Sequence, residues 1–183
     1  MLLNEACLIS DMIDEIQPAS ILDCGSGSRV DRNIIQPHIA ATFAGHNVIW
    51  SDVRPIPNQI QCDYADGEAL AEKVPTVDLV TALSLLEHVE DVEKTIDNLV
   101  RITSKHLILS VPKHYPWHGC PIDNAFRPSA EELAAKLTAR GMTVIRAVES
   151  PPEQFGNVSA ACASIVLAKK EQKCGCSVES QRA

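Results

Sequence analysis

The chain has 183 residues, of which 45% are hydrophobic and 22% are charged. This composition is ordinary for a folded globular domain, so it excludes a chain that is disordered throughout. The length fits one domain, which we expect over residues 1–168, with a disordered polar tail over 169–183. No apolar run approaches the roughly 20 residues needed to span a bilayer, and the first residues lack the basic start of a signal peptide. We therefore expect a cytoplasmic protein without a membrane partner.

The formal net charge is −8, with 24 acidic and 16 basic side chains. Phosphate contacts dominate the affinity of nucleic-acid-binding proteins, so this balance argues against a nucleic-acid partner. The seven cysteines are an odd number and are scattered along the chain, which indicates reduced thiols. Cys174 and Cys176 are too isolated to form a zinc site, which needs about four ligands. No metal is expected.

Expected helices and strands alternate along the chain. Apolar residues at helical spacing predict a first helix that ends before Pro18, and Ser129 with Glu132 forms a capping box that opens the last helix, which Gly141 ends. Further helices are expected over 31–44 and 66–73 and from Asp91 onward. Strands are expected over 21–24, 47–51, 60–62, 77–82, 107–111, 143–148 and 163–167. Two prolines between residues 52 and 59 argue against a helix there.

This alternation predicts an α/β fold with a mainly parallel sheet that helices cover on both faces. Such sheets bind ligands at the carboxyl ends of their strands. The residues that directly follow each strand are therefore the candidate site.

The first three strand ends carry the residue types of a nucleoside site. Gly25 and Gly27 follow Asp23 in a loop whose backbone a ligand can approach closely. Asp52 ends the second strand, where a carboxylate accepts hydrogen bonds from ribose hydroxyls. Asp63 follows the third strand, where a carboxylate can accept a hydrogen bond from an adenine amine. We expect Asp52 to lie at a solvent-accessible strand end.

Candidate acid–base residues follow the fourth and fifth strands. His88 has either a chemical role or a capping and packing role in a short helical turn. The long loop over 112–128 contains His114, His118 and Asp123, which suit either proton transfer or plain loop hydrogen bonding. The spacing of these three residues fits no common metal site.

Three stretches carry a family resemblance. Residues 21–28, ILDCGSGS, resemble the acid-x-Gly-x-Gly motif of class I S-adenosylmethionine-dependent methyltransferases. Residues 78–89, DLVTALSLLEHV, resemble the FDxVxxxxxLEHV stretch of small bacterial members, and residues 115–128 resemble a loop in some of those members. The resemblance implies a Rossmann-like doubly wound sheet of about seven strands. Most strands would be parallel, with an antiparallel strand near the C-terminus.

The resemblance also implies site roles with S-adenosylmethionine as cofactor. Asp23 would orient the loop or meet the cofactor amine, the glycines would approach the homocysteine part, and Tyr64 would hold adenine through its backbone. The implied cofactor-binding residues are Asp23, Gly25, Gly27, Asp52, Asp63, Tyr64, Ala82 and Leu83. The implied catalytic residues are His118 as base, Asp123 orienting its ring, and His88. Arg29 departs from the family, which often has a third glycine there.

The expected reaction is methyl transfer to an oxygen or nitrogen of a small or medium-sized acceptor. One alternative is a non-catalytic protein that binds the cofactor and regulates another methyltransferase. A second alternative is an enzyme of lyase type that acts on the sulfonium. Residues 82–85, ALSL, stand where amino-directed DNA methyltransferases carry an Asn/Asp-Pro-Pro-aromatic motif, which favours a small-molecule acceptor.

Overall fold

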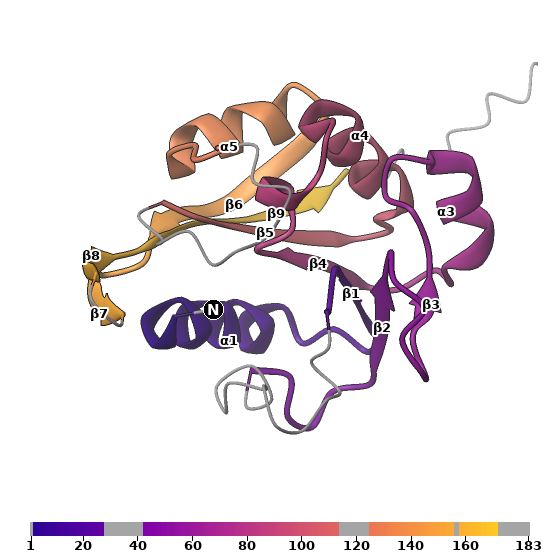
Figure 1. Ribbon diagram of the computed structural model, residues 1–183, viewed down its shortest axis with the longest axis horizontal. Coiled ribbons are helices and arrows are strands. Elements are labelled where there is room, and N and C mark those ends of the chain that lie inside the picture. Colours follow the sequence, from indigo (N-terminus) through magenta and orange to yellow (C-terminus); the bar gives the residue numbers. More distant parts are fainter. Residues whose placement is uncertain (1, 28–41, 114–124, 156–157, 172–183) are drawn as a thin grey trace, which may run out of the picture.

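A seven-stranded sheet forms the centre of the computed structural model, which describes residues 2–27, 42–113, 125–155 and 158–171. The strands lie in the order β3-β2-β1-β4-β5-β9-β6 (Figure 1). Their bounds are β1 (Ile21–Cys24), β2 (Val48–Asp52), β3 (Ile60–Gln61), β4 (Leu79–Leu83), β5 (His106–Pro112), β6 (Met142–Glu149) and β9 (Ala163–Lys170).

Five neighbouring strands of this sheet run parallel. β1 pairs with β2 and β4 in parallel, as do β2 with β3 and β4 with β5. β9 is inserted between β5 and β6 and runs antiparallel to both. The expected mostly parallel sheet with an antiparallel strand near the C-terminus is therefore confirmed. A separate two-stranded hairpin, β7 (Glu153–Phe155) and β8 (Val158–Ala161), was not anticipated from the sequence.

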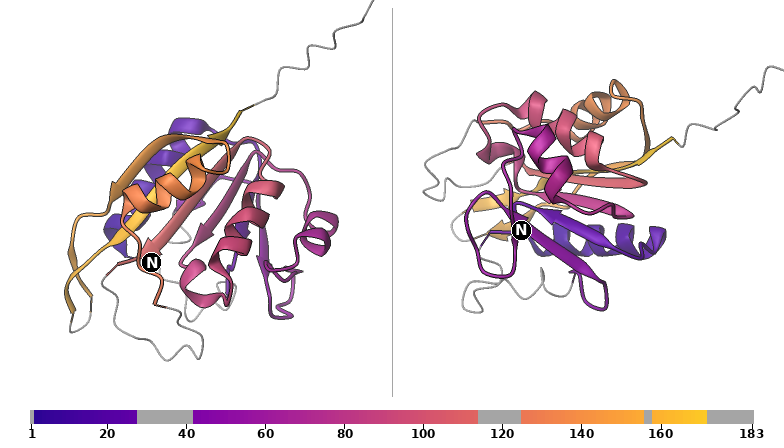
Figure 2. Two further views of the ribbon diagram at one scale, coloured as in Figure 1. Left: turned by 90° about the horizontal axis from the view of Figure 1, so that it is seen from above. Right: turned by 90° about the vertical axis from the view of Figure 1, so that its right-hand side faces the viewer.

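Helices cover both faces of the sheet, as Figures 1 and 2 show. α1 (Leu3–Ile16) lies on one face, and α3 (Gly67–Lys73), α4 (Val92–Ile102) and α5 (Ala130–Thr138) lie on the other. Each face of the sheet has its own apolar core. On the first face, α1 packs against alternate strand residues such as Leu83 and Ile108. The opposite residues, such as Val80 and Leu109, pack against the three other helices.

Short polar side chains begin the helices on the second face, as the sequence indicates. Asp66 and Asp91 accept hydrogen bonds from the third backbone amide after them, at the starts of α3 and α4. Ser129 and Glu132 form the predicted capping box of α5. Gly141, with a φ of 77°, takes the left-handed conformation that follows this helix.

Two sequence-based expectations, a helix over 31–44 and a tail from residue 169, concern segments at the edges of the described ranges. The helix expected over 31–44 falls mostly on residues 28–41, which lie outside the described residues. The tail expected from residue 169 begins too early, because β9 continues to Lys170 and pairs there with Met142. The Lys170 ammonium also donates to backbone carbonyls at the end of α4, which ties this strand end to the domain.

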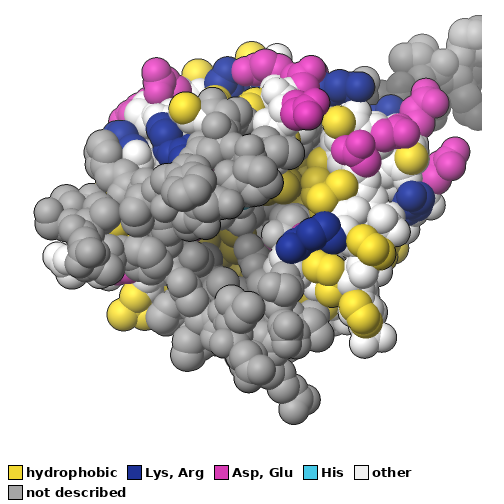
Figure 3. All heavy atoms as spheres, in the orientation of Figure 1, with side chains coloured by type: hydrophobic (Ala, Val, Ile, Leu, Met, Phe, Trp, Pro, Cys, Tyr) yellow, Lys and Arg dark blue, Asp and Glu magenta, His cyan; other side chains and the backbone are white. Residues whose placement is uncertain are grey.

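Acidic side chains dominate the outer surface of the second face. In Figure 3 they gather over α5, α4 and α3, along the upper edge and the right side of the view. The exposed acids of these helices are Glu68, Glu72, Glu93, Asp97, Glu131 and Glu132. Within the described ranges, no helix is both long and apolar enough to cross a membrane.

Candidate functional site

The loop after β1 has a backbone that only glycine adopts easily. Gly25 and Gly27 have φ values of 73° and 61°, in the left-handed region where a Cβ atom costs energy. A Cβ atom on Gly25 would also lie 2.8 Å from Cδ1 of Leu85, which follows β4. The loop therefore packs against the residues that follow β4.

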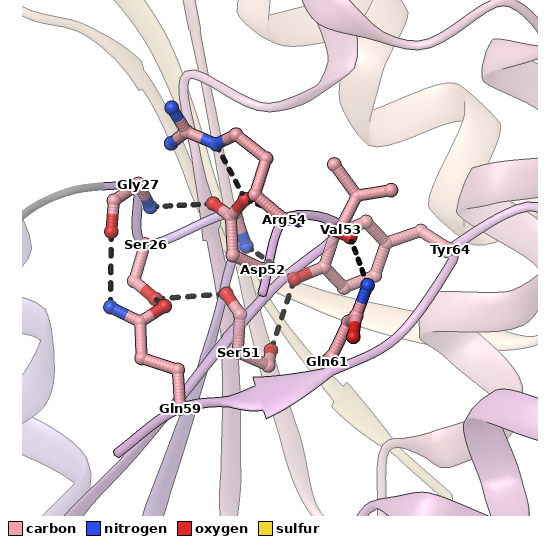
Figure 4. A network of polar contacts seen from close by, with 10 residues as sticks. Ser26, Gly27, Ser51, Asp52, Val53, Arg54, Gln59, Gln61 and Tyr64 are labelled. Atoms are coloured by element: carbon pink, nitrogen blue, oxygen red, sulfur yellow. Dashed lines mark hydrogen bonds and ion pairs between the residues drawn. The ribbon is translucent and has the colours of Figure 1, made fainter. Parts of the chain in front are cut away.

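Asp52 joins this loop to the end of β2 (Figure 4). Its Oδ2 atom accepts a hydrogen bond of 2.7 Å from the amide of Gly27. Its Oδ1 atom accepts from the amide and Nε of Arg54, at 2.9 and 3.0 Å. The carboxylate is only 4% exposed, so the expected solvent-accessible position is wrong. The Arg54 side chain that pairs with this carboxylate is itself 60% exposed.

These contacts keep Asp52 ionised. Burial acts to raise the pKa of its carboxyl, but the hydrogen bonds from Arg54 and Gly27 outweigh burial and hold the pKa below its ordinary value. Of the roughly four acceptor sites of a carboxylate, these three hydrogen bonds leave about one for a ligand hydroxyl.

Ser26 and Gln59 hold the loop in place, and sequence reasoning missed both. The amide of Gln59 donates from Nε2 to the carbonyl of Gly27 at 3.0 Å, and its Oε1 accepts from the Ser26 hydroxyl. Figure 4 shows Gln59 reaching the loop from the segment before β3. A glutamine between a proline-rich turn and a strand carries no recognisable signal, so only the fold reveals this contact.

The Tyr64 side chain contacts the glycine loop that follows β1. Its hydroxyl accepts from the amide of Gly25 at 2.7 Å and lies 3.1 Å from the hydroxyl of Ser51 (Figure 4). Burial raises the pKa of this phenol well above its ordinary value, so it stays neutral. The Tyr64 carbonyl accepts a hydrogen bond of 2.8 Å from the side chain of Asn98. Tyr64 therefore shapes the site from within the protein.

Asp63 lies on the surface beside the start of α3. It is exposed, and its Oδ1 accepts from the amide of Ala65 at 2.9 Å. It borders a surface cavity of about 470 Å³ that α3 and α4 also line. An adenine amine could reach this carboxylate from solvent, unlike the enclosed carboxylate of Asp52.

Asp23, Ala82 and Leu83 are completely buried beneath the carboxyl edge. The Asp23 carboxylate accepts a hydrogen bond of 2.7 Å from the hydroxyl of Thr81 on the neighbouring strand. After Leu83 the chain turns at Ser84, whose φ of 54° is unusual for a residue other than glycine. This turn directs the following segment toward the glycine loop.

The catalytic candidates divide into one that the structure describes and two that it does not. His88 ends the short 3-10 helix η1 (Leu86–His88), and its side chain is 24% exposed. Its Nε2 atom lies 3.6 Å from the carboxylate of Glu87. His118 and Asp123 lie outside the described residues, and so does Arg29.

The arrangement brings together three of the predicted residues and the turn after a fourth. Gly25, Gly27, Asp52 and the turn after Leu83 meet at one edge of the sheet, and Asp63 follows β3 nearby in the chain. This edge offers a glycine backbone without Cβ atoms, an ionised carboxylate and apolar walls. Such a set suits a nucleoside carrying a polar tail.

No family model matches the sequence, and no curated protein is similar to it in sequence. Solved structures of methyltransferases, however, are similar in fold. 1,6-Didemethyltoxoflavin-N1-methyltransferase from Burkholderia thailandensis, with S-adenosylhomocysteine bound, has a TM-score of 0.64 at 15% identity, covering 91% of this chain and 78% of that chain. Magnesium protoporphyrin IX methyltransferase from Synechocystis PCC 6803, with bound SAH, has a TM-score of 0.59 at 15% identity, covering 92% and 84%.

A S-adenosylmethionine-dependent methyltransferase from Aquifex aeolicus is similar over 89% of both chains, with a TM-score of 0.53 and 17% identity. At these identities the likeness concerns the fold. The strand order, the antiparallel β9 and the helices on both faces agree with it. The chain therefore has the Rossmann-like fold of the class I S-adenosylmethionine-dependent methyltransferases.

Proposed function

We propose that this protein is a S-adenosylmethionine-dependent methyltransferase that acts on an oxygen or nitrogen of a small or medium-sized acceptor. The observation that carries the proposal is the contact between the glycine loop and Asp52 at the carboxyl edge of a sheet of this fold. Structures similar in fold include enzymes named as N-, carbon- and O-methyltransferases, so the fold does not decide which atom is methylated. Our choice of oxygen or nitrogen rests on the acid–base candidates of this chain, such as His118 and Asp123.

The described residues fit such a cofactor. Gly25 and Gly27 provide a backbone surface without Cβ atoms, and the glycine loop borders Leu85. Asp52 would accept from the ribose hydroxyls, and Asp63 from the adenine amine. When bound, the cofactor supplies a methyl group on a positively charged sulfur.

The work left to the protein is to position the acceptor and, where needed, to remove its proton. Positioning supplies much of the acceleration in a displacement of this kind. A base is needed only when the acceptor is a hydroxyl or a protonated amine. His88 is the described candidate, and His118 with Asp123 is the candidate pair in the loop that follows β5.

Binding and turnover together test the proposal. Calorimetry should detect binding of both S-adenosylmethionine and S-adenosylhomocysteine to the full chain. Incubation with methyl-labelled S-adenosylmethionine and a metabolite library should then yield S-adenosylhomocysteine and a labelled product in equal amounts. Binding without any turnover would favour the regulatory alternative, and a product mass without an added methyl group would favour the lyase.

A further inference from the structure

Glu87 is a buried acid without a hydrogen bond. It lies in η1, directly after the turn that ends β4, and its side chain has no exposed surface. Among the described residues, neither of its carboxylate oxygens has a hydrogen-bond partner. Burying a carboxyl group in this way costs stability, and residues of this kind are commonly retained for their chemistry.

The groups around Glu87 come from three parts of the chain. The imidazole of His88 is the nearest, with Nε2 3.6 Å from Oε1, and it is partly exposed where Glu87 is not. Arg127, before α5, and Glu5, on α1, also act on the carboxyl charge. Glu5 is buried as well, but its oxygens accept hydrogen bonds from the amide of Leu2 and the hydroxyl of Ser110. Of these two acids, Glu87 is the one whose oxygens have no hydrogen-bond partner among the described residues.

This environment places the titration of Glu87 close to neutral pH. Burial raises the pKa of its carboxyl to about 7, and the charge of Glu5 adds to the rise. Its own backbone amide, His88 and Arg127 act in the opposite direction. The imidazole of His88 therefore acts on the ionisation of the Glu87 carboxyl.

The pair closely follows a residue that contacts the proposed cofactor site. Leu85, two residues before Glu87, is the side chain that a Cβ atom on Gly25 would strike. The turn at Ser84 therefore brings η1 next to the glycine loop, at the carboxyl edge where ligands bind in sheets of this kind.

We propose that Glu87 and His88 form the proton-accepting pair for the methyl acceptor, with His88 as the base and Glu87 as its positioning residue. The inference rests on the proposed function and adds to it that the acceptor carries an O–H or N–H group. As the acceptor's lone pair bonds to the methyl carbon, the carbon–sulfur bonding pair stays on sulfur. The acceptor's proton passes to the imidazole, the Glu87 carboxylate stabilises the resulting charge, and solvent then takes the proton.

A titration of Glu87 without any ligand tests the coupling. The carboxyl carbon of carbon-13-labelled glutamate reports its ionisation, and the signal that disappears in Glu87→Gln assigns it. His88→Gln should raise the pKa of Glu87 above about 7, because the imidazole lowers it. Glu5→Gln should lower that pKa, because the second acid raises it. A titration of Glu87 that His88→Gln leaves unchanged would overturn the pair.

The pH dependence of methyl transfer tests the role. With labelled S-adenosylmethionine and the acceptor pool that supports turnover, wild-type kcat should rise across pH 7. Glu87→Gln should lower kcat by about 100-fold at pH 8 and remove that rise, with the affinity for S-adenosylhomocysteine unchanged. Glu90→Gln, at an exposed acid three residues after Glu87, should keep the wild-type profile.

A Glu87→Gln profile equal to wild type refutes the inference but leaves the proposed methyltransferase function standing. Absence of cofactor binding in wild type refutes both.

Discussion

The amide of Gly27 donates to the carboxylate of Asp52 across 2.7 Å, joining the loop after the first strand to the end of the second. The two residues are 25 positions apart in the chain, and parallel pairing of β1 with β2 brings their strand ends together. The same carboxylate accepts two hydrogen bonds from Arg54. A ligand that binds Asp52 therefore meets a carboxylate whose position is already set, so little ordering remains to be done on binding.

Replacing this carboxylate should weaken cofactor binding. Asp52→Asn removes the charge from the hydrogen bonds to ribose, which we expect to cost about 1.5 to 3 kcal/mol, or roughly 10- to 100-fold in affinity for S-adenosylhomocysteine by calorimetry. Asp78→Asn is the matched control, since Asp78 pairs with Lys105 near the opposite end of β4. Equal affinity in wild type and Asp52→Asn would remove Asp52 from the site.

Asp52→Asn should also lower the free energy of unfolding, because it removes a buried, hydrogen-bonded carboxylate. Because the pKa of Asp52 is lowered in the folded protein, ionisation stabilises the fold above the unfolded pKa. That contribution is lost as pH falls through the folded pKa. Chemical denaturation should thus show wild type and Asp52→Asn converging in free energy of unfolding at acidic pH and separating at neutral pH. A constant difference at all pH values would contradict this account.

Tyr64→Phe should loosen the glycine loop without touching the ligand. The substitution leaves the amide of Gly25 with one hydrogen bond instead of two, since Ser51 still supplies its carbonyl. We expect a loss of about 1 kcal/mol in free energy of unfolding, and weaker cofactor binding because the loop is less ordered. Hydrogen exchange at Gly25 should accelerate in the variant. Protection equal to wild type would show that Ser51 suffices to hold the loop.

The sequence predicts the sheet well because its signals are local. The buried strand over 21–24 and the capping box at Ser129 depend on neighbouring residues, and both are confirmed. The hairpin of β7 and β8 was missed, since a strand of three residues carries no period to detect. Gln59 was missed for another reason. Its side chain contacts a loop more than 30 residues away in the chain, and no spacing reveals such contacts.

Gly67 marks a close contact that allows no side chain. A Cβ atom there would lie 2.1 Å from Oδ1 of Asn98, whose Nδ2 donates to the carbonyl of Tyr64. Gly67→Ala should displace Asn98 and lower the free energy of unfolding by about 1 to 3 kcal/mol, despite alanine's higher helix propensity. Asn98→Ala removes the obstructing amide, so Gly67→Ala should cost far less in that background. Equal costs in both backgrounds would rule out the steric explanation.

Glu87→Gln should make the protein more stable at alkaline pH, because ionising the buried wild-type carboxyl costs free energy in the folded protein. With a pKa of about 7 in the folded protein and 4.5 as the ordinary value, the native state retains a proton that the unfolded state releases between these limits. Wild-type stability therefore falls as pH rises through this window, by the order of 3 kcal/mol in total.

Glutamine has the shape of the protonated acid and does not ionise. The two proteins should thus unfold at similar denaturant concentrations near pH 4.5, while the variant should be the more stable above pH 8. Glu90→Gln, exposed and in the same segment, should show no such crossover. If the difference between wild type and Glu87→Gln does not change with pH, the Glu87 carboxyl is not held protonated by its burial.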